Sequence, residues 1–154
     1  MITIKGITDE DFVNYKKPSM FIAFPTCNWK CGMRVCQNST LAKSKNFIVS
    51  IDSVIDRYIK NKITKAIVFG GLEPFDSWEE LIKFVAKLRK KVDDDIVIYT
   101  GYNEDEVEEK IKYLCQYPNI IIKFGRFIPN DKPHYDEILG IELASNNQYA
   151  RRIS

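Results

Sequence analysis

Three of the four cysteines of this 154-residue chain lie within ten consecutive positions, in the segment FPTCNWKCGMRVCQNS (24–39). Cys27 and Cys31 are separated by three residues, and Cys31 and Cys36 by four. Three thiolates from one loop can hold three irons of a [4Fe–4S] cluster and leave the fourth iron open to an outside ligand. They can also bind Zn²⁺ with a fourth ligand such as His134, the only histidine. The spacing alone leaves open an iron–sulfur cluster, a zinc site and unliganded loop cysteines.

The composition is that of an ordinary globular protein. Hydrophobic residues make up 45% and charged residues 29%, and the net charge is +2, so a strongly basic nucleic-acid binder is not indicated. No apolar run of about 18 residues occurs, and the first residues, MITIKGITDEDFVNY, carry acids instead of the basic and apolar start of a leader peptide. We therefore expect one domain over residues 1–154, in the cytoplasm, without a membrane or nucleic-acid partner. Thiols stay reduced there, which disfavours a disulfide.

Two further segments carry residues that could bind a ligand. In GGLEP (70–74), Gly70 and Gly71 allow a ligand to approach the backbone, and Glu73 offers a carboxylate, a combination that suits an amino-acid-like ammonium group. In YTGY (99–102), Thr100 offers a hydroxyl, and Tyr99 or Tyr102 offers a ring for stacking. Each segment is also an ordinary turn between a strand and a helix.

Apolar runs and helical periodicity alternate along the chain. Buried strands are predicted over 20–24, 65–71, 95–101 and 119–125. Amphipathic helices are predicted over 50–62, 76–91 and 103–115. Their N-terminal caps are expected at Ser50, at Ser77 with Glu80 in capping-box spacing, and at Asn103. This order indicates an α/β fold whose parallel strands are covered by helices on one or both faces. Residues 137–145 are expected to add an edge strand.

A distinctive segment directly follows each predicted strand. These segments are the cysteine loop, GGLEP, TGY (100–102) and GRF (125–127). Ligands of parallel α/β folds bind beyond the carboxyl ends of the strands. We therefore expect all four segments to meet at one rim and to form one site.

With these segments in strand order, the chain resembles the radical S-adenosylmethionine (SAM) superfamily, and within it the small activating proteins of anaerobic ribonucleotide reductase. The resemblance runs from about residue 12 to the end. CNWKC is typical of the cluster loop of these proteins, GGLEPF is similar to their Gly-Gly-acid-Pro motif, and YTGY matches a segment of the activases. Further similarities lie in CQNS (36–39), FVNY (12–15), FGRFI (124–128) and SNNQYARR (145–152).

The resemblance implies a partial (β/α) barrel of parallel strands, of the radical SAM type. It implies that Cys27, Cys31 and Cys36 ligate a [4Fe–4S] cluster whose unique iron is chelated by SAM. It further implies that the amino group of SAM is lined by Gly70, Gly71 and Glu73, and that Thr100 and Tyr102 lie near the nucleoside.

The implied activity is reductive cleavage of SAM to a 5′-deoxyadenosyl radical, which takes a hydrogen atom from a glycine of the anaerobic ribonucleotide reductase large subunit. The second implied partner is an electron donor of the flavodoxin or ferredoxin type. The chain has Cys-x3-Cys-x4-Cys where the family has Cys-x3-Cys-x2-Cys, Val35 in place of an aromatic residue, and YKK (15–17) in place of an early Gly-x-Gly. The alternatives are a radical SAM enzyme with a different substrate and, from another class, a zinc-binding α/β interaction module.

Overall fold

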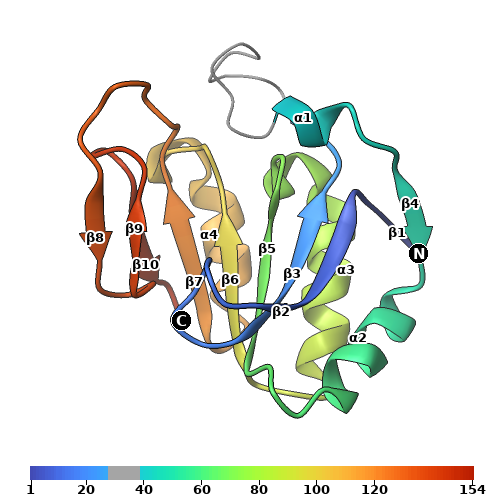
Figure 1. Ribbon diagram of the computed structural model, residues 1–154. Coiled ribbons are helices and arrows are strands. Elements are labelled where there is room, and N and C mark those ends of the chain that lie inside the picture. The colour runs from blue at the N-terminus through green and yellow to red at the C-terminus, as the bar shows by residue number, and fades with distance from the viewer. Residues whose placement is uncertain (28–38) are drawn as a thin grey trace.

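The computed structural model describes residues 1–27 and 39–154, and its centre is a six-stranded mixed sheet (Figure 1). The strands lie in the order β10-β7-β6-β5-β3-β2. Strands β3, β5, β6 and β7 run parallel, whereas β2 and β10 join the two edges antiparallel. Their bounds are β2 Gly6–Asp11, β3 Ser19–Phe24, β5 Ala66–Gly71, β6 Asp95–Tyr99, β7 Ile120–Phe124 and β10 Tyr149–Arg152. The predicted α/β class and the predicted buried strands are confirmed.

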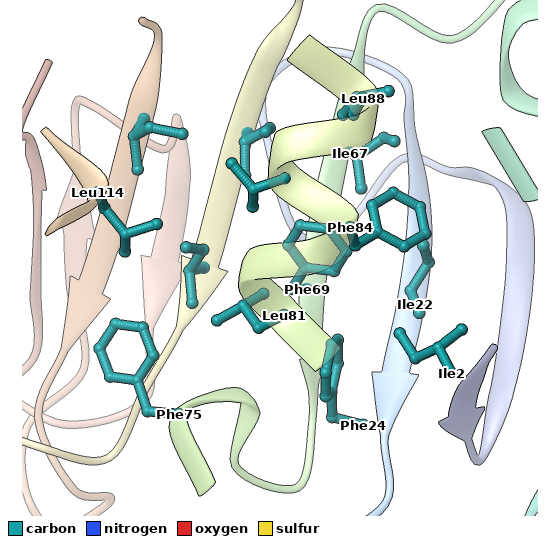
Figure 2. Packing of buried hydrophobic residues seen from close by; sticks show 14 of the residues in the cluster. Ile2, Ile22, Phe24, Ile67, Phe69, Phe75, Leu81, Phe84, Leu88 and Leu114 are labelled. Atoms are coloured by element: carbon teal, nitrogen blue, oxygen red, sulfur yellow. The ribbon is translucent and has the colours of Figure 1, made fainter. Parts of the chain in front are cut away.

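The three longest described helices, α2 (Ile51–Lys60), α3 (Trp78–Arg89) and α4 (Glu108–Leu114), contribute to the same hydrophobic core, and α3 and α4 lie behind the strands in Figure 1. The main hydrophobic core lies between these helices and the sheet (Figure 2). At its centre, the ring of Phe69 from β5 lies 5.1 Å from that of Phe84 of α3 and 5.6 Å from that of Phe24 of β3. Side chains alternate along a strand, so the residues between these core positions point to the opposite face.

We call this opposite face the inner face, and loops instead of helices cover it. Leu139 and Leu143, from the segment containing β8 (His134–Asp136) and β9 (Ile141–Leu143), pack against Val68 and Val97 in a second apolar cluster. The chain between β2 and β3 also crosses this face, and its Lys16 N–H donates to the carbonyl of Leu139 at 2.7 Å. The inner face is therefore only partly filled by side chains and remains available for a cavity.

The remaining elements are short, and of these β1, β4 and α1 were not predicted. Strand β1 (Ile2–Ile4) pairs antiparallel with β4 (Phe47–Val49), and α1 (Ser39–Ala42) is a single turn. One-turn 3₁₀ helices, η1 (Pro74–Ser77) and η2 (Glu104–Glu106), precede α3 and α4. In residues 1–27 and 39–154, none of the helices has the length and apolarity needed to cross a bilayer.

The predicted helix caps have different outcomes. Ser50 caps α2 as predicted, because its hydroxyl accepts a backbone N–H from the first turn at 3.3 Å. The capping box at Ser77 is wrong: the Ser77 hydroxyl lies 2.8 Å from that of Thr26, and the Glu80 carboxylate accepts the N–H of Thr3 at 3.1 Å. Tertiary partners have thus replaced the local ones at α3.

The third predicted helix, 103–115, is divided in two. Asn103 precedes η2, where its backbone N–H donates to the carboxylate of Glu106 at 2.8 Å. The regular helix α4 begins only at Glu108. The capping interaction predicted for Asn103 therefore belongs to the short helical turn ahead of α4.

The segment 137–145 was predicted to form an edge strand of the main sheet, and this position is wrong. Part of this segment forms β9, but β9 pairs with β8 in a separate two-stranded sheet, and β10 takes the edge beside β7. The carboxylate of Asp136 accepts the N–H groups of Leu139 and Ala150, at 2.9 Å each. These bonds fold the segment over the inner face and bring residues 149–152 to the edge.

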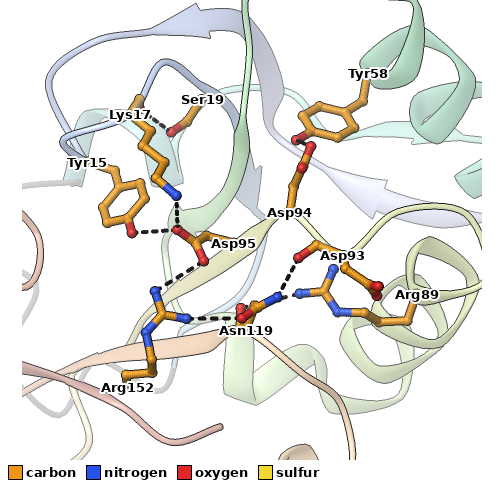
Figure 3. A network of polar contacts seen from close by, with 10 residues as sticks. All are labelled: Tyr15, Lys17, Ser19, Tyr58, Arg89, Asp93, Asp94, Asp95, Asn119 and Arg152. Carbon is orange, nitrogen blue, oxygen red and sulfur yellow. Dashed lines mark hydrogen bonds and ion pairs between the residues drawn. The ribbon is translucent and has the colours of Figure 1, made fainter.

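A polar network closes the end of the sheet opposite the predicted rim (Figure 3). At its centre is Asp95, which is 6% exposed. Its carboxylate accepts hydrogen bonds from Lys17 at 2.7 Å, from Tyr15 at 2.8 Å and from Arg152 at 3.1 Å. Burial acts to raise the pKa of Asp95, but these three hydrogen bonds outweigh it and hold the pKa below its usual value.

We expect Asp95→Asn to lower the free energy of unfolding by about 2 kcal/mol at pH 7, because it removes charge-assisted bonds that join three segments. A lowered carboxyl pKa stabilises the fold above the unfolded-state value, near 4, and this stabilisation is lost as the pH falls through the folded-state value. Urea unfolding at several pH values should show the difference between variant and wild type shrinking in acid. The control is Asp56→Asn, which removes an exposed ion pair with Lys91 and should cost less than about 0.5 kcal/mol. Equal costs for the two variants would contradict this role.

Candidate functional site

Cys27 lies three residues beyond the end of β3, at the carboxyl end of the parallel strands, and is partly exposed. The start of its loop is fixed to the GGLEP turn, because the backbone N–H of Glu73 donates to the carbonyl of Thr26 at 2.6 Å. The other predicted cluster ligands, Cys31 and Cys36, lie outside the described residues. The cysteine loop and the GGLEP turn therefore begin side by side, as the order of strands predicts.

The two glycines of this turn allow β5 to lie close against β3. Gly71 has a φ of +84°, and an added Cβ would lie 2.8 Å from the backbone of Ala23 and Phe24. At Gly70, an added Cβ would lie 2.8 Å from the ring of Phe21. A side chain at position 71 would require β3 to shift, and one at position 70 would require the ring of Phe21 to move. The glycines thus set the position of the turn relative to the cysteine loop.

Glu73 is only 4% exposed, and its carboxylate joins the turn after β5 to the turn after β6. One carboxylate oxygen accepts the N–H of Phe75 at 3.0 Å, and the other accepts the N–H of Gly101 at 2.8 Å. Burial raises the pKa of Glu73 to about 7, although these hydrogen bonds act in the opposite direction. No ion pair joins it to a lysine or arginine of residues 1–27 or 39–154. A ligand ammonium group would supply the charge that stabilises its ionised form.

The YTGY segment places its side chains in different directions. The buried hydroxyl of Thr100 accepts the N–H of Tyr102 at 3.0 Å. The Tyr102 hydroxyl donates to Asp76 of η1 at 2.6 Å. The Tyr99 hydroxyl, on the inner face, donates to the carbonyl of Asn14 at 2.6 Å. Tyr99 and Tyr102, both considered for stacking, are therefore on different sides of the turn.

A cavity of about 330 Å³ lies on the inner face, beside these turns. Its floor is formed by sheet residues, its rim by the turns after β5 and β6, and its walls by the loop after β2 and the segment that contains β9. The predicted site residues Gly71 and Thr100 line it, while Gly70, Glu73 and Tyr102 lie next to lining residues. Tyr99, Gly101, Lys123, Glu142 and Gln148 are also among the residues that line it.

Lys123, which lies in the floor of this cavity, was not among the predicted site residues. Lys123 is 8% exposed, and burial lowers its pKa to about 8. A signal was present in the sequence, because Lys123 is the only charged residue in NIIIKFG (119–125), a run that otherwise reads as a strand buried on both faces. A charge in such a strand marks either a paired structural group or a ligand site.

The segments GRF (125–127) and SNNQ (145–148) contact one another. The side-chain amide of Asn147 donates to the carbonyl of Arg126 at 2.8 Å, and that of Gln148 donates to the carbonyl of Gly125 at 3.3 Å. Asn147 is held in turn by the hydroxyl of Ser145 at 2.7 Å. These bonds fix the end of β7 and complete the cavity wall that contains Gln148.

Comparison with known proteins identifies the class of this cysteine-bearing α/β domain. The family model for the 4Fe-4S single cluster domain matches residues 18–149, from β3 to the start of β10. The chain therefore belongs to the family of 4Fe-4S single cluster domains. No curated protein and no solved structure matches the chain. Membership of this family supports the iron–sulfur interpretation of the cysteine loop. The family description names no substrate.

The residues at the rim fit such a cluster. Thiolates are the ligands of iron–sulfur clusters, and Cys27 stands at the rim beside a turn whose glycines carry no side chain that would obstruct it. His134 is the alternative fourth zinc ligand. One of its ring nitrogens lies 2.5 Å from the carbonyl oxygen of Gln148. That contact gives His134 a structural partner within the fold.

Proposed function

We propose that this protein is a radical SAM activase, which cleaves SAM reductively at a [4Fe–4S] cluster and generates a glycyl radical on an anaerobic ribonucleotide reductase. The observation that carries the proposal is the position of the cavity. It is bounded by the GGLEP and YTGY turns, at the rim where Cys27 begins the cysteine loop. In a family of 4Fe-4S domains, a concave site of this size supports an organic cofactor bound beside the cluster.

When bound, the reduced cluster would supply one electron for the homolytic cleavage of SAM, which would release methionine and provide the radical that takes a hydrogen atom from a glycine of the reductase. The chain itself holds and shields the reactants. Cys27, Cys31 and Cys36 hold the cluster. The methionine amino group of SAM would lie near Gly70, Gly71 and the buried carboxylate of Glu73, and the nucleoside toward Thr100 and Tyr102. The sheet behind the cavity limits access of water to the bound reactants.

The arrangement of layers supports a partial (β/α) barrel of the radical SAM type, because helices cover only the outer face and the cavity lies on the inner one. An open inner face suits a protein substrate that inserts a glycine-bearing loop. The partners that we propose are the large subunit of the reductase and a cytoplasmic electron donor of the flavodoxin or ferredoxin type.

The experiment is an assay for SAM cleavage by the anaerobically reconstituted protein. With dithionite and SAM, we expect 5′-deoxyadenosine and methionine in equal amounts, and with a candidate reductase added, the electron spin resonance signal of a glycyl radical. Cleavage without a glycyl radical on any anaerobic ribonucleotide reductase would favour a radical SAM enzyme with another substrate. Stoichiometric zinc and no iron after reconstitution would exclude both and favour the zinc module.

A further inference from the structure

The chain shortly after the cysteine loop forms an exposed surface that combines positive charge with apolar side chains. We call residues 43–48 (KSKNFI) the KSKNFI surface, and all six are exposed. Lys43 and Lys45 carry the charge, and neither forms an ion pair with a residue of 1–27 or 39–154. Phe47 is 54% exposed and Ile48 is 70% exposed. Exposed apolar residues beside charged ones are typical of protein interaction sites.

Hydrogen bonds hold this surface against the rest of the fold. The ammonium group of Lys5, which is 9% exposed, donates to the carbonyls of Ala42 at 3.1 Å and Ser44 at 2.5 Å. Strand β4, which contains Phe47 and Ile48, pairs with β1 and with no other strand of the described ranges. The surface is therefore ordered before a partner binds, which lowers the entropy cost of binding.

The KSKNFI surface adjoins the start of the cysteine loop. Its residue Asn46 lines a hollow of about 440 Å³ together with Pro25 and Thr26, the two residues that precede Cys27. This hollow shares no lining residue with the inner-face cavity. In Figure 1, α1, which leads into the surface, lies beyond the carboxyl end of β3. A protein bound here would contact the chain next to Cys27 and leave the inner face open.

The charges on the two sides of this hollow have opposite signs. Residues 18–51, which contain the cysteine loop and the KSKNFI surface, have four of the chain's 23 lysines and arginines and none of its 21 acidic residues. The opposite wall carries the carboxylates of Asp76, Glu79 and Glu80. An acidic protein would be attracted to the side with the lysines and repelled from the start of α3, which favours a single orientation.

We propose that the KSKNFI surface is the docking site of the electron donor, and that this donor is a small acidic redox protein. The inference rests on the proposed function, because that function needs a source of electrons for the cluster. The donor loses one electron, the cluster gains it, and no covalent bond forms or breaks. Because the inner-face cavity opens elsewhere, the donor and the glycine-bearing substrate can be bound at the same time.

The test measures how fast a reduced acidic flavodoxin transfers an electron to the cluster of the reconstituted protein, by rapid mixing at low ionic strength. We expect the double variant Lys43→Gln, Lys45→Gln to lower this rate about 5- to 20-fold, because charges at the edge of an interface accelerate association. The difference should shrink in about 0.5 M salt, which screens exposed charges. Glu79→Gln, on the opposite wall, should raise the rate.

Two controls separate docking from other effects. The double variant Lys62→Gln, Lys90→Gln removes the same charge from exposed positions that precede β5 and β6, at the other end of the parallel strands, and should keep the rate within about 2-fold of wild type. Iron content and reduction by dithionite, which needs no docking surface, should match the wild type in every variant. Equal rates for the two double variants would show that Lys43 and Lys45 only protect the edge of β4 from unwanted pairing.

The two proposals fail in different ways. If the dithionite-reduced protein cleaves SAM but the Lys43, Lys45 double variant accepts electrons from flavodoxin at the wild-type rate, the docking site is wrong and the proposed function stands. If flavodoxin reduces the cluster in a lysine-dependent way but the reduced protein cleaves no SAM, the proposed function is wrong and the docking site stands. If the double variant, reduced by dithionite, cleaves SAM but forms no glycyl radical, the surface binds the reductase and its assignment to the donor is wrong.

Discussion

Cys27→Ala should yield a protein that folds but carries no [4Fe–4S] cluster after anaerobic reconstitution. Cys27 lies in the loop after β3 and is partly exposed, so its loss removes one thiolate from a set of three without disturbing the hydrophobic core. The expected result is a fall in bound iron from about four atoms per chain to a small fraction of that. The brown colour and the formation of 5′-deoxyadenosine should be lost with it. Iron analysis, visible absorbance and chromatography of the SAM products measure these quantities.

The matched control for this variant is Cys115→Ala. Cys115 is exposed, ends α4, and its thiol donates weakly to the carbonyl of Ile153 at 3.5 Å. Removing it should leave the iron content and the SAM cleavage of the wild type. A full complement of iron in Cys27→Ala, or loss of iron in Cys115→Ala, would overturn the assignment of Cys27 as a cluster ligand.

Gly71→Ala should have the largest effect on the fold, lowering the free energy of unfolding by about 2–5 kcal/mol. Two costs add at this position. The φ of +84° disfavours any side chain, and the new Cβ would lie 2.8 Å from the backbone of Ala23 and Phe24, which cannot move without shifting β3. Because the same strand leads into the cysteine loop, we also expect weaker SAM binding. Urea unfolding and calorimetry measure the two effects.

Gly6→Ala is the control for this prediction. Gly6 lies in β2, at the edge of the same sheet, and an added Cβ would meet nothing within 4 Å. Its replacement should change the free energy of unfolding by less than about 0.5 kcal/mol. If Gly71→Ala were as harmless as Gly6→Ala, the glycine would not be needed for the approach of β5 to β3.

The central strands of the fold could be predicted because they are buried on both faces and read as continuous apolar runs. Strand β2, with the sequence GITDED, could not be predicted, because glycine and acidic residues disfavour strands. In the fold, pairing with β3 holds β2 extended. The same holds for the placement of residues 137–145, which depends on bonds from Asp136 to two distant N–H groups. Such contacts between segments far apart in sequence leave no local pattern to read.

The candidate site shows the same division. Strand order predicted that Cys27 and the GGLEP turn begin side by side, and the structure places them so. The tie from Glu73 to Gly101 and the entry of Lys123 into the cavity both depend on how β5, β6 and β7 align. A lysine in an apolar run can be recognised in the sequence, but only the register of the strands shows that Lys123 points to the inner face.

The course of the chain also has a consequence for its synthesis on the ribosome. The parallel strands and the helices that cover the outer face are complete once Phe124 has emerged, but the inner face is covered by Leu139 and Leu143, and β10 pairs with β7 only afterwards. A nascent chain therefore exposes the apolar inner face of the sheet and the unpaired edge of β7 until residues 134–152 have been synthesised. Chaperone binding and aggregation of truncated products should concentrate in this interval.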